Sequence, residues 1–269
     1  MKLTPHLAPH EYHQHPAVSK HGLDAFRKAP ALYQFVRNNP LPPTPSMRFG
    51  SLYHTAMLEP EKLVTEYYTM PDVDRRTKDG KMIWEAAIVE CGKREQVKSD
   101  DLLKAKAMRN QLMQHTAAAN AITLNREYVE ASLFWTDPVT GVECRARPDL
   151  IREDGFIVDL KTAADASADA FQRAAVNYGY HRQAAFYLDA WKLISGEAPK
   201  GFIFVVQETE APYLTAVYVA SPAMIEAGRA EIGQDLQRFA ECLKADNWPG
   251  LPEAPQELTL PRWALPAVA

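Results

Sequence analysis

The chain has 269 residues, of which 46% are hydrophobic, and its formal net charge is −4 at pH 7. This length and hydrophobic content predict a single domain over residues 1–269, and the negative charge does not by itself indicate a nucleic-acid-binding protein. The three cysteines are widely spaced and odd in number, which argues against a disulfide framework, and no apolar run has the length of a membrane span. We therefore expect a cytoplasmic protein without a membrane partner. The sequence has no Gly-x-x-x-x-Gly-Lys-Ser/Thr phosphate loop, so we do not expect it to use ATP.

Helical periodicity dominates the first half of the chain. It predicts helices over residues 19–37, 45–59, 80–91 and 99–115, preceded by a mobile segment over residues 1–18. Gly50 and His54 lie four residues apart and would share one helix face. Gly50 would let that face approach a sheet, and the His54 imidazole would complete the coordination of a metal ion. The alternative is an ordinary, partly buried histidine that hydrogen-bonds a backbone carbonyl.

Basic side chains gather ahead of the third predicted helix. Arg75 and Arg76, with Lys78 and Lys81 close by, fall on a loop and a helix start. They would either follow a phosphate backbone, with salt-sensitive binding, or be solvated surface charge.

Strands are predicted from residue 128 onward. Residues 128–136, a turn at 138–141 and a hairpin of strands 143–152 and 156–162 would form three consecutive antiparallel strands. The turn decides the register of the hairpin. A three-residue loop with Gly155 in the left-handed conformation places Asp149 opposite Asp159, whereas a two-residue loop places Asp149 opposite Leu160, on the other face. The period of two places Lys161 on the same face as Asp159.

The hairpin with the three-residue loop brings two carboxylates and an ammonium together. Carboxylates roughly 4 Å apart repel by about 4 kcal/mol at an effective dielectric constant of 20, unless one is protonated or a cation lies between them. Hard oxygen ligands select Mg²⁺, with Mn²⁺ as a substitute, and Lys161 would then orient a water or stabilise charge on a phosphorane. The alternative is that Asp149 and Lys161 are solvated strand residues and that Pro148-Asp149 is a turn dipeptide.

Three further side chains are placed near this site by strand alternation. Glu130 is a third carboxylate candidate for the metal, although Glu127 would serve equally and either would also fit a solvated strand end. Arg145 and Arg147 share the alternation phase of Asp149, so we expect them to contact DNA phosphates beside the metal.

Helices and strands alternate in the rest of the chain. We expect helices over 168–176, 181–195 and 222–245, strands over 201–207 and 214–220, and a proline-rich tail over 249–269. Gln183 and Tyr187 lie four residues apart on the second of these helices, where they would contact phosphate oxygens or support Lys161. Tyr187 would otherwise belong to an aromatic packing face. The element order predicts an α/β fold with a mixed central β-sheet flanked by helices, its catalytic core over residues 128–220.

Four stretches of the chain carry a resemblance to a known family. They are Arg147-Pro148-Asp149 with Asp159-Leu160-Lys161, Tyr12-His13 with Pro16-Ala17-Val18-Ser19-Lys20 and Leu23-Asp24-Ala25-Phe26, Phe49-Gly50-Ser51-Leu52-Tyr53-His54 with Leu58-Glu59-Pro60, and Tyr178-Gly179-Tyr180-His181-Arg182-Gln183-Ala184-Ala185-Phe186-Tyr187. Together they resemble the PD-(D/E)xK nuclease superfamily, and within it the RecE-like exonuclease branch. The resemblance runs through most of the chain.

The resemblance implies a restriction-endonuclease-like core and a set of site residues. His54, Asp149, Asp159 and the backbone carbonyl of Leu160 would bind the metal, with Glu130 as a further candidate, and Asp149, Asp159, Lys161, Gln183 and Tyr187 would form the catalytic set. Arg182 joins Arg75, Arg76, Arg145 and Arg147 as a candidate DNA contact.

The resemblance also implies an activity. A RecE-like enzyme would be a processive 5′-to-3′ exonuclease that leaves a 3′ single strand for annealing recombination, as a ring-shaped homo-oligomer with a single-strand annealing protein as partner. Two alternatives remain open: an endonuclease of the same fold, and a catalytically silent DNA-binding or assembly module.

Overall fold

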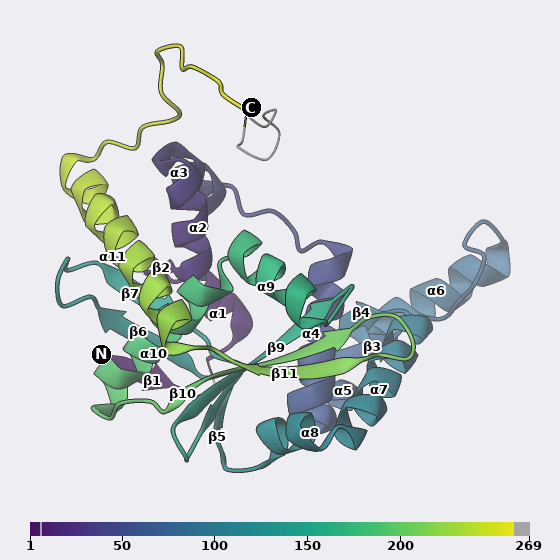
Figure 1. Cartoon of the computed structure of the whole chain (residues 1–269). Coiled ribbons are helices and arrows are strands. Elements are labelled where there is room, and N and C mark those ends of the chain that lie inside the picture. The colour runs from purple at the N-terminus through teal and green to yellow at the C-terminus, as the bar shows by residue number, and fades with distance from the viewer. Residues whose placement is uncertain (6, 261–269) are drawn as a thin grey trace, which may run out of the picture.

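Two sheets form the centre of the fold (Figure 1), which a computed structural model describes for residues 1–5 and 7–260. The larger sheet has the strand order β11-β10-β9-β8-β5, in which β9 and β10 run parallel and the other neighbours antiparallel. The smaller has the order β1-β6-β7-β2. Their strands are β1 Lys2–Thr4, β2 Val18–Ser19, β5 Arg126–Val129, β6 Ser132–Thr136, β7 Glu143–Ala146, β8 Leu150–Arg152, β9 Phe156–Ala163, β10 Gly201–Glu208 and β11 Thr215–Val219.

Helices cover both faces of the larger sheet, as the sequence predicted. They are α1 Pro9–Gln14, α2 Lys20–Lys28, α3 Pro30–Asn38, α4 Pro45–Leu58, α5 Leu63–Glu66, α6 Lys78–Cys91, α7 Ser99–Gln114, α8 Thr116–Thr123, α9 Ala168–Asn177, α10 Tyr180–Ser195 and α11 Pro222–Ala245, with a 3₁₀ turn at Pro60–Lys62. Strands β3 Tyr67–Thr69 and β4 Glu95–Val97 pair at the base of α6, which projects from the body as an arm (Figure 1). Among the helices that the structure describes, none combines the length and apolarity needed to cross a bilayer.

The two faces of the larger sheet pack against different helices. Phe202, Phe204 and Val206 of β10 point into a core shared with α2, α10 and α11. Val205 of β10 and Val158 of β9 point the other way, into a core built with α4, α7 and α8. The period of two in these strands therefore sorts the apolar side chains between two helical layers.

The hairpin between β8 and β9 has the register that its turn predicts. Leu150 pairs with Val158 and Ile151 with Ile157, which leaves a three-residue loop. Gly155 adopts φ +85° and its N–H donates to the Arg152 carbonyl at 3.0 Å, so the left-handed position falls where the sequence predicted it.

The prediction of three long antiparallel strands is wrong at two places that face each other. Residues 128–136 divide into β5 and β6, because Glu130 adopts φ +50° and leaves the extended conformation. Residues 143–152 divide into β7 and β8 around Pro148, which has no N–H for a ladder. The Glu130 N–H donates to the Asp149 carbonyl at 3.0 Å across the gap. The chain thus passes from one sheet to the other at this point.

The N-terminal third also differs from the predictions. The helix expected over residues 19–37 is two helices, since Ala29 is extended ahead of Pro30. The segment over residues 1–18, expected to be mobile, contains β1, which pairs with β6, and α1, whose Tyr12 is buried. Of the proline-rich tail, residues 249–260 have no helix or strand, and residues 261–269 lie outside the described part of the chain.

Candidate metal centre and active site

A histidine and two carboxylates meet where the chain passes between the sheets. His54 projects from α4, Glu130 lies between β5 and β6, and Asp149 immediately precedes β8. The Nδ1 of His54 is 3.4 Å from Asp149 Oδ1 and 3.6 Å from Glu130 Oε1. One ligand atom from each of the three lies within 4.8 Å of the others, a spacing that suits a single metal ion.

Strand β9 adds a further carboxylate, that of Asp159, and the ammonium of Lys161. Asp159 Oδ2 is 2.5 Å from Lys161 Nζ, and Asp159 Oδ1 accepts a hydrogen bond from Gln183 Nε2 at 2.6 Å. Asp149 Oδ2 accepts the backbone N–H of Leu160 at 2.6 Å, in the stretch where Pro148 ends the ladder. Asp149 is therefore tied to the strand that carries Asp159 and Lys161.

Charge and burial shift the pKa values of this group in opposite directions. Burial by itself would lower the pKa of His54, but the carboxylates of Asp149 and Glu130 outweigh it and raise that pKa well above its usual value. Burial raises the pKa of Glu130, and His54 only partly offsets it. Burial also acts to raise the pKa of Asp149, yet the facing His54 and Lys161 bring it below its usual value.

Asp159 is the carboxyl that burial affects most clearly. Its side chain is 1% exposed, and burial raises its pKa to about 6 despite the Lys161 ammonium. Burial would lower the pKa of Lys161, but Asp159 and Asp149 raise it, so the lysine stays charged at neutral pH. Asp159 and Lys161 therefore form an ion pair, and the Asp149 carboxylate lies outside that pair.

The residues present fit a divalent metal ion. Asp159 Oδ2 is buried and makes no hydrogen bond of acceptable geometry, although Lys161 Nζ lies beside it as a counter-charge. Three carboxylates and one imidazole provide mostly hard oxygen ligands, which suit Mg²⁺ or Mn²⁺. A cation here would relieve the repulsion among Glu130, Asp149 and Asp159. The backbone carbonyl of Leu160 stays a predicted metal ligand. The N–H of the same residue donates to Asp149 Oδ2.

Of the two candidate glutamates, the structure places only Glu130 in the cluster. Glu130 lies beside His54 and Asp149, whereas Glu127 lines a separate surface hollow with Glu153 and Trp191. Glu130 has a left-handed backbone, φ +50°, and its carboxylate lies 3.6 Å from His54 Nδ1. Strand alternation could not have revealed this, because alternation assumes an unbroken strand.

Tyr187 lies on the face of α10 that carries Gln183. Burial raises the pKa of the Tyr187 phenol well above its usual value, further raised by Tyr12, Asp159 and Asp149, while a hydrogen bond with Gln183 partly offsets this. Its ring also packs near Phe202. Tyr187 therefore does both things that the sequence offered as alternatives: its ring packs near Phe202, and its phenol hydrogen-bonds Gln183 beside the site.

Arg145 and Arg147 point toward the N-terminal segment. The Arg145 guanidinium donates to the carbonyls of Tyr12 and His15, the latter at 2.8 Å, and Arg147 donates to the Leu7 carbonyl at 2.9 Å and to Ser132 Oγ. Both guanidinium groups cover the Tyr12 ring, at 4.8 and 4.3 Å from its centroid. They are occupied in holding this segment, so their predicted contact with DNA phosphates would need those bonds to be shared.

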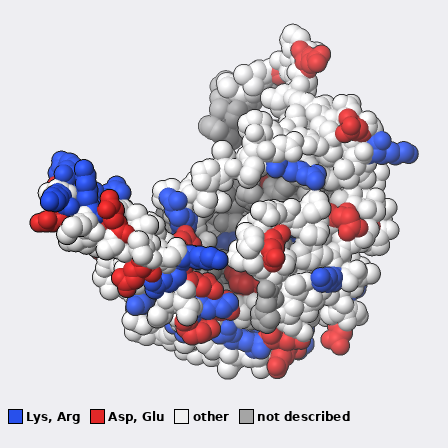
Figure 2. All heavy atoms as spheres, turned by 180° about the vertical axis from the view of Figure 1, so that it is seen from behind, with Lys and Arg blue, Asp and Glu red and all other residues white. Residues whose placement is uncertain are grey.

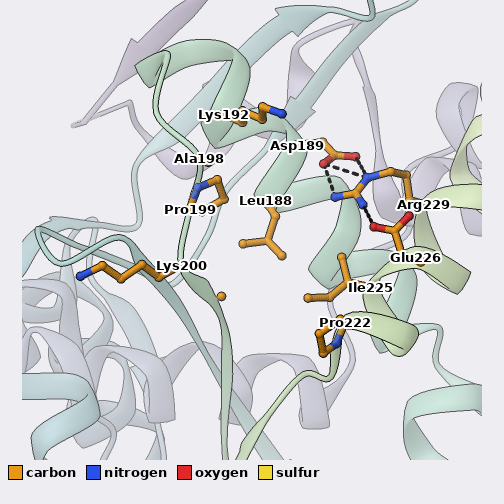
Figure 3. A pocket seen from close by; sticks show the side chains of 11 residues that line it. Leu188, Asp189, Lys192, Ala198, Pro199, Lys200, Pro222, Ile225, Glu226 and Arg229 are labelled. Atoms are coloured by element: carbon orange, nitrogen blue, oxygen red, sulfur yellow. Dashed lines mark hydrogen bonds and ion pairs between the residues drawn. The ribbon is translucent and has the colours of Figure 1, made fainter.

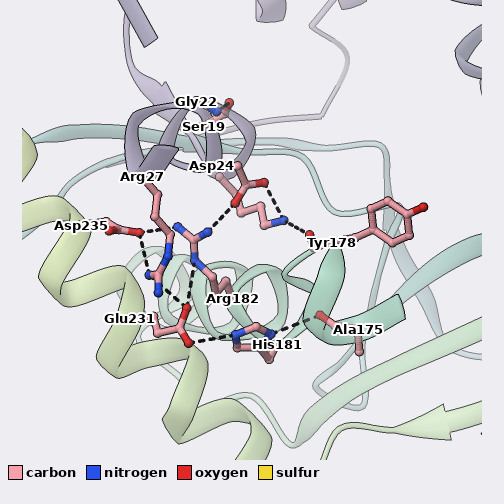
Figure 4. A network of polar contacts seen from close by, with 11 residues as sticks. Ser19, Gly22, Asp24, Arg27, Ala175, Tyr178, His181, Arg182, Glu231 and Asp235 are labelled. Carbon is pink, nitrogen blue, oxygen red and sulfur yellow. Dashed lines mark hydrogen bonds and ion pairs between the residues drawn. The ribbon is translucent and has the colours of Figure 1, made fainter. Parts of the chain in front are cut away.

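Arg182 does not lie where a DNA contact is needed, contrary to the prediction. It is 5% exposed and donates to Asp24 at 2.7 Å and to Asp235 (Figure 4). A guanidinium this deeply buried, with its charge shared between two carboxylates, is not accessible to a phosphate, so we assign it a structural role.

Arg75 and Arg76 lie on the projecting arm. Figure 2 shows Lys and Arg side chains gathered at the end of this arm, with acidic side chains among them. Arg76 Nε is 2.9 Å from Asp74 Oδ1, and the Arg75 guanidinium lies 4.5 Å from the Trp84 ring centroid. Their DNA contact stays a prediction.

A hollow of about 240 Å³ lies elsewhere, between α10, α11 and the start of β10 (Figure 3). At its edge Arg229 pairs with Asp189 at 2.7 Å and with Glu226, and Lys192 and Lys200 also line the hollow. It contains no cluster of metal-binding side chains and is separate from the site described above.

The sequence analysis missed two residues that border the site. Tyr180 places its ring 4.7 Å from Lys161 Nζ, and Tyr12 lies under Arg145 and Arg147. Both stand within the stretches that carry the family resemblance, which was the available signal. Neither has a local spacing that would indicate contact with a strand so far away in the sequence.

Comparisons with known proteins identify the family and the fold. The family model described as "PDDEXK-like domain of unknown function (DUF3799)" matches residues 19–258. The crystal structure of a protein from Eubacterium rectale, provisionally named an exonuclease, aligns with a TM-score of 0.62 at 11% identity, covering 95% of this chain and 96% of that one. An alkaline exonuclease from Laribacter hongkongensis aligns with a TM-score of 0.28 at 15% identity, over 73% of this chain and 97% of that one, which is too weak to support an argument. The comparison with curated proteins found no match.

Proposed function

The chain belongs to the PDDEXK-like family, and from that membership we propose that it is a Mg²⁺-dependent nuclease that hydrolyses DNA phosphodiester bonds. In its finer form, the proposal is a processive 5′-to-3′ exonuclease that acts on ends of double-stranded DNA and leaves a 3′ single strand for annealing recombination. Mn²⁺ would substitute for Mg²⁺, because it accepts the same ligands in the same geometry.

One observation carries the proposal. The carboxylates of Asp149 and Asp159 and the Lys161 ammonium, from two neighbouring strands, converge beside His54 and Glu130. Three carboxylates around one lysine and one histidine are unfavourable for a purely structural cluster and favourable for a cation site.

Each residue has a role that its contacts support. A divalent cation bound by Asp149, Asp159, Glu130 and His54 would polarise the phosphodiester and acidify a water. Lys161, charged at neutral pH, would donate hydrogen bonds to the attacking water or to the oxygens on which negative charge grows. Gln183 holds the Asp159 carboxylate in orientation through its 2.6 Å bond, and Tyr187 extends that support.

The polarity, the preference for ends and the partners depend on the RecE-like resemblance and on the likeness in fold to the Eubacterium rectale protein. The proposal includes a ring-shaped homo-oligomer that encloses DNA, and a single-strand annealing protein that takes up the 3′ strand. Light scattering of the purified protein tests the first of these directly.

The test of the proposed function compares a linear duplex carrying 5′ phosphates with a covalently closed circle of the same sequence. We expect Mg²⁺ to permit loss of the linear duplex only, with 3′ overhangs as intermediates, and a chelator to stop the reaction. Cleavage of the circle would show that the protein is an endonuclease and not an exonuclease. DNA binding without breakdown of either substrate would identify a catalytically silent module and overturn the proposal.

A further inference from the structure

An exposed tyrosine lies two residues before the tyrosine whose ring covers the lysine of the candidate active site. Tyr178, between α9 and α10, is 65% exposed. Its ring stacks on that of Tyr180, with centroids 5.7 Å apart and an interplanar angle of 28°, and the Tyr180 ring lies 4.7 Å from Lys161 Nζ. The rings of Tyr178 and Tyr180 therefore lie in sequence between the solvent and the Lys161 ammonium.

This pair continues a longer aromatic stack. Tyr180 stacks on Phe171 at 5.6 Å, and Phe171 on Tyr218 at 5.1 Å with an interplanar angle of 12°. Phe171 is buried, and Tyr180 and Tyr218 are partly buried, so Tyr178 is the solvent-facing end of an ordered column. The column supports the exposed ring from beneath.

The backbone of Tyr178 is fixed although its side chain is exposed. Lys20 Nζ donates to the Tyr178 carbonyl at 2.6 Å, and the Tyr178 N–H donates to the Ala174 carbonyl at 2.9 Å. Figure 4 shows the Tyr178 ring pointing away from the polar network to which its carbonyl is anchored. The next residue, Gly179, has φ +64°, and a Cβ there would lie 3.3 Å from Lys20 Nζ.

A rigid, exposed aromatic ring is costly to leave in water and well suited to stacking. Nucleobases stack on such rings regardless of sequence, and each stacked base contributes about 1–3 kcal/mol to binding of a single strand. A phosphate held at Lys161 would have its neighbouring nucleotide within reach of Tyr178. A base inside a duplex has both faces covered by its neighbours, so only an unpaired base can use this ring.

We propose that Tyr178 is a stacking platform for an unpaired nucleobase next to the scissile phosphate. This inference rests on the proposed function, and it narrows the substrate to a strand whose terminal bases are already separated from their complement when the bond is cut. Tyr178 would therefore contribute to binding of the strand and to opening of the duplex end.

The test uses a single-stranded oligonucleotide in which 2-aminopurine, whose emission falls when it stacks, replaces one base at successive positions. Ca²⁺ replaces Mg²⁺, and gel electrophoresis checks that the strand stays intact. We expect the emission to fall at one position with the parent protein and with Tyr178→Trp. We expect Tyr178→Ala to lose that fall and to bind the strand roughly 5- to 100-fold more weakly.

Val176→Ala is the matched control, because Val176 is an exposed, non-aromatic side chain (72% exposed) near the same turn. It should bind and quench like the parent. An equal fall in emission with Tyr178→Ala, or no position-dependent fall with the parent, would overturn the platform.

The two proposals fail in different ways. If the parent degrades DNA in Mg²⁺ but Tyr178→Ala keeps the quenching, only the platform is wrong. If the parent quenches through Tyr178 but never hydrolyses DNA in Mg²⁺, the nuclease is wrong, and the ring remains a base-binding site.

Discussion

Two clusters of charged side chains contact the first turn of α10, one through Gln183 and the other through Arg182, and they are built differently. The metal-centre cluster consists of His54, Glu130, Asp149, Asp159 and Lys161. The α2–α10–α11 network, shown in Figure 4, consists of Lys20, Asp24, Arg27, Arg182, Glu231 and Asp235.

Pairing separates the two clusters. In the network three cations face three carboxylates, with Arg27 and Glu231 at 3.0 Å and Lys20 and Asp24 at 2.8 Å. Even the Nε of Arg182, which makes no hydrogen bond, lies 3.7 Å from Glu231. In the metal-centre cluster three carboxylates share one lysine and one histidine, and a buried oxygen of Asp159 has no hydrogen bond.

This difference indicates which cluster stabilises the fold and which performs chemistry. A balanced buried network is worth most when intact, because removing one member leaves an uncompensated charge. An unbalanced cluster is a cost to the metal-free fold that a bound cation would remove. Substitutions should therefore affect stability in the α2–α10–α11 network and hydrolysis in the metal-centre cluster.

The largest expected effect is on stability, from Arg182→Ala. It leaves the Asp235 carboxylate, whose side chain is 3% exposed, without its closest partner, and we expect the free energy of unfolding to fall by about 3–5 kcal/mol in chemical denaturation. Arg229→Ala is the matched control. Its pair with Asp189 is about 40% exposed on both sides (Figure 3), so the loss should stay within about 1 kcal/mol.

The same variant tests the corrected role of Arg182 in DNA binding. A phosphate contact contributes about one unit to the slope of log affinity against log salt. We expect that slope to be unchanged in Arg182→Ala at a temperature where the variant is folded. A slope smaller by one, with little change in stability, would return Arg182 to the list of DNA contacts.

The next effect is on hydrolysis, from Asp159→Asn. The amide keeps the shape of the side chain but weakens cation binding and turns a donor toward Lys161, so we expect the rate to fall by roughly 10²–10³-fold. Because burial already raises the pKa of Asp159 to about 6, the neutral side chain should not lower the stability of the metal-free protein. Asp165→Asn, an exposed carboxylate just past β9, is the control and should hydrolyse DNA like the parent. A large loss of stability in Asp159→Asn would instead place Asp159 with the structural network.

Local patterns predicted the parts of this site that local geometry controls. The turn at Gly155 set the register of β8 and β9, helical periodicity placed His54 on α4, and the spacing of Gln183 and Tyr187 placed both on one face of α10. In each case the deciding neighbours lie within a few residues along the chain, where hairpin and helix geometry are fixed. The role predicted for Gly50 is wrong, because a Cβ at Gly50 would meet no atom within 4 Å and no close approach to the sheet depends on this glycine.

The sequence could not show where the strands break or which partners the arginines find. Pro148 is a sign that a ladder stops, but nothing near Glu130 indicates a left-handed backbone, since that conformation is held by the Asp149 carbonyl across the gap. Strand alternation could not show the hydrogen-bond acceptors of Arg145. These acceptors, the carbonyls of Tyr12 and His15, lie about 130 residues earlier, in a segment with no strong periodicity of its own.

The smallest expected effect is the pH dependence of stabilisation by metal. Asp159 and His54 both have raised pKa values in the metal-free fold. The stability contributed by protonated Asp159 is therefore lost as the pH rises from the pKa of Asp159 in the unfolded chain through its folded pKa of about 6. The stability contributed by the His54 cation is lost as the pH rises through the raised pKa of His54. A metal ion needs both groups deprotonated and therefore competes with protons. With Mn²⁺ at about 100 times its dissociation constant near pH 8, we expect about 2.7 kcal/mol of stabilisation, seen as a rise in Tm, and a much smaller rise near pH 5.5. Asp159→Asn should abolish most of the rise at both pH values. A rise that is independent of pH, or that survives this substitution, would show that the stabilising ion binds away from Asp149 and Asp159, and the contrast between the two clusters would lose its chemical meaning.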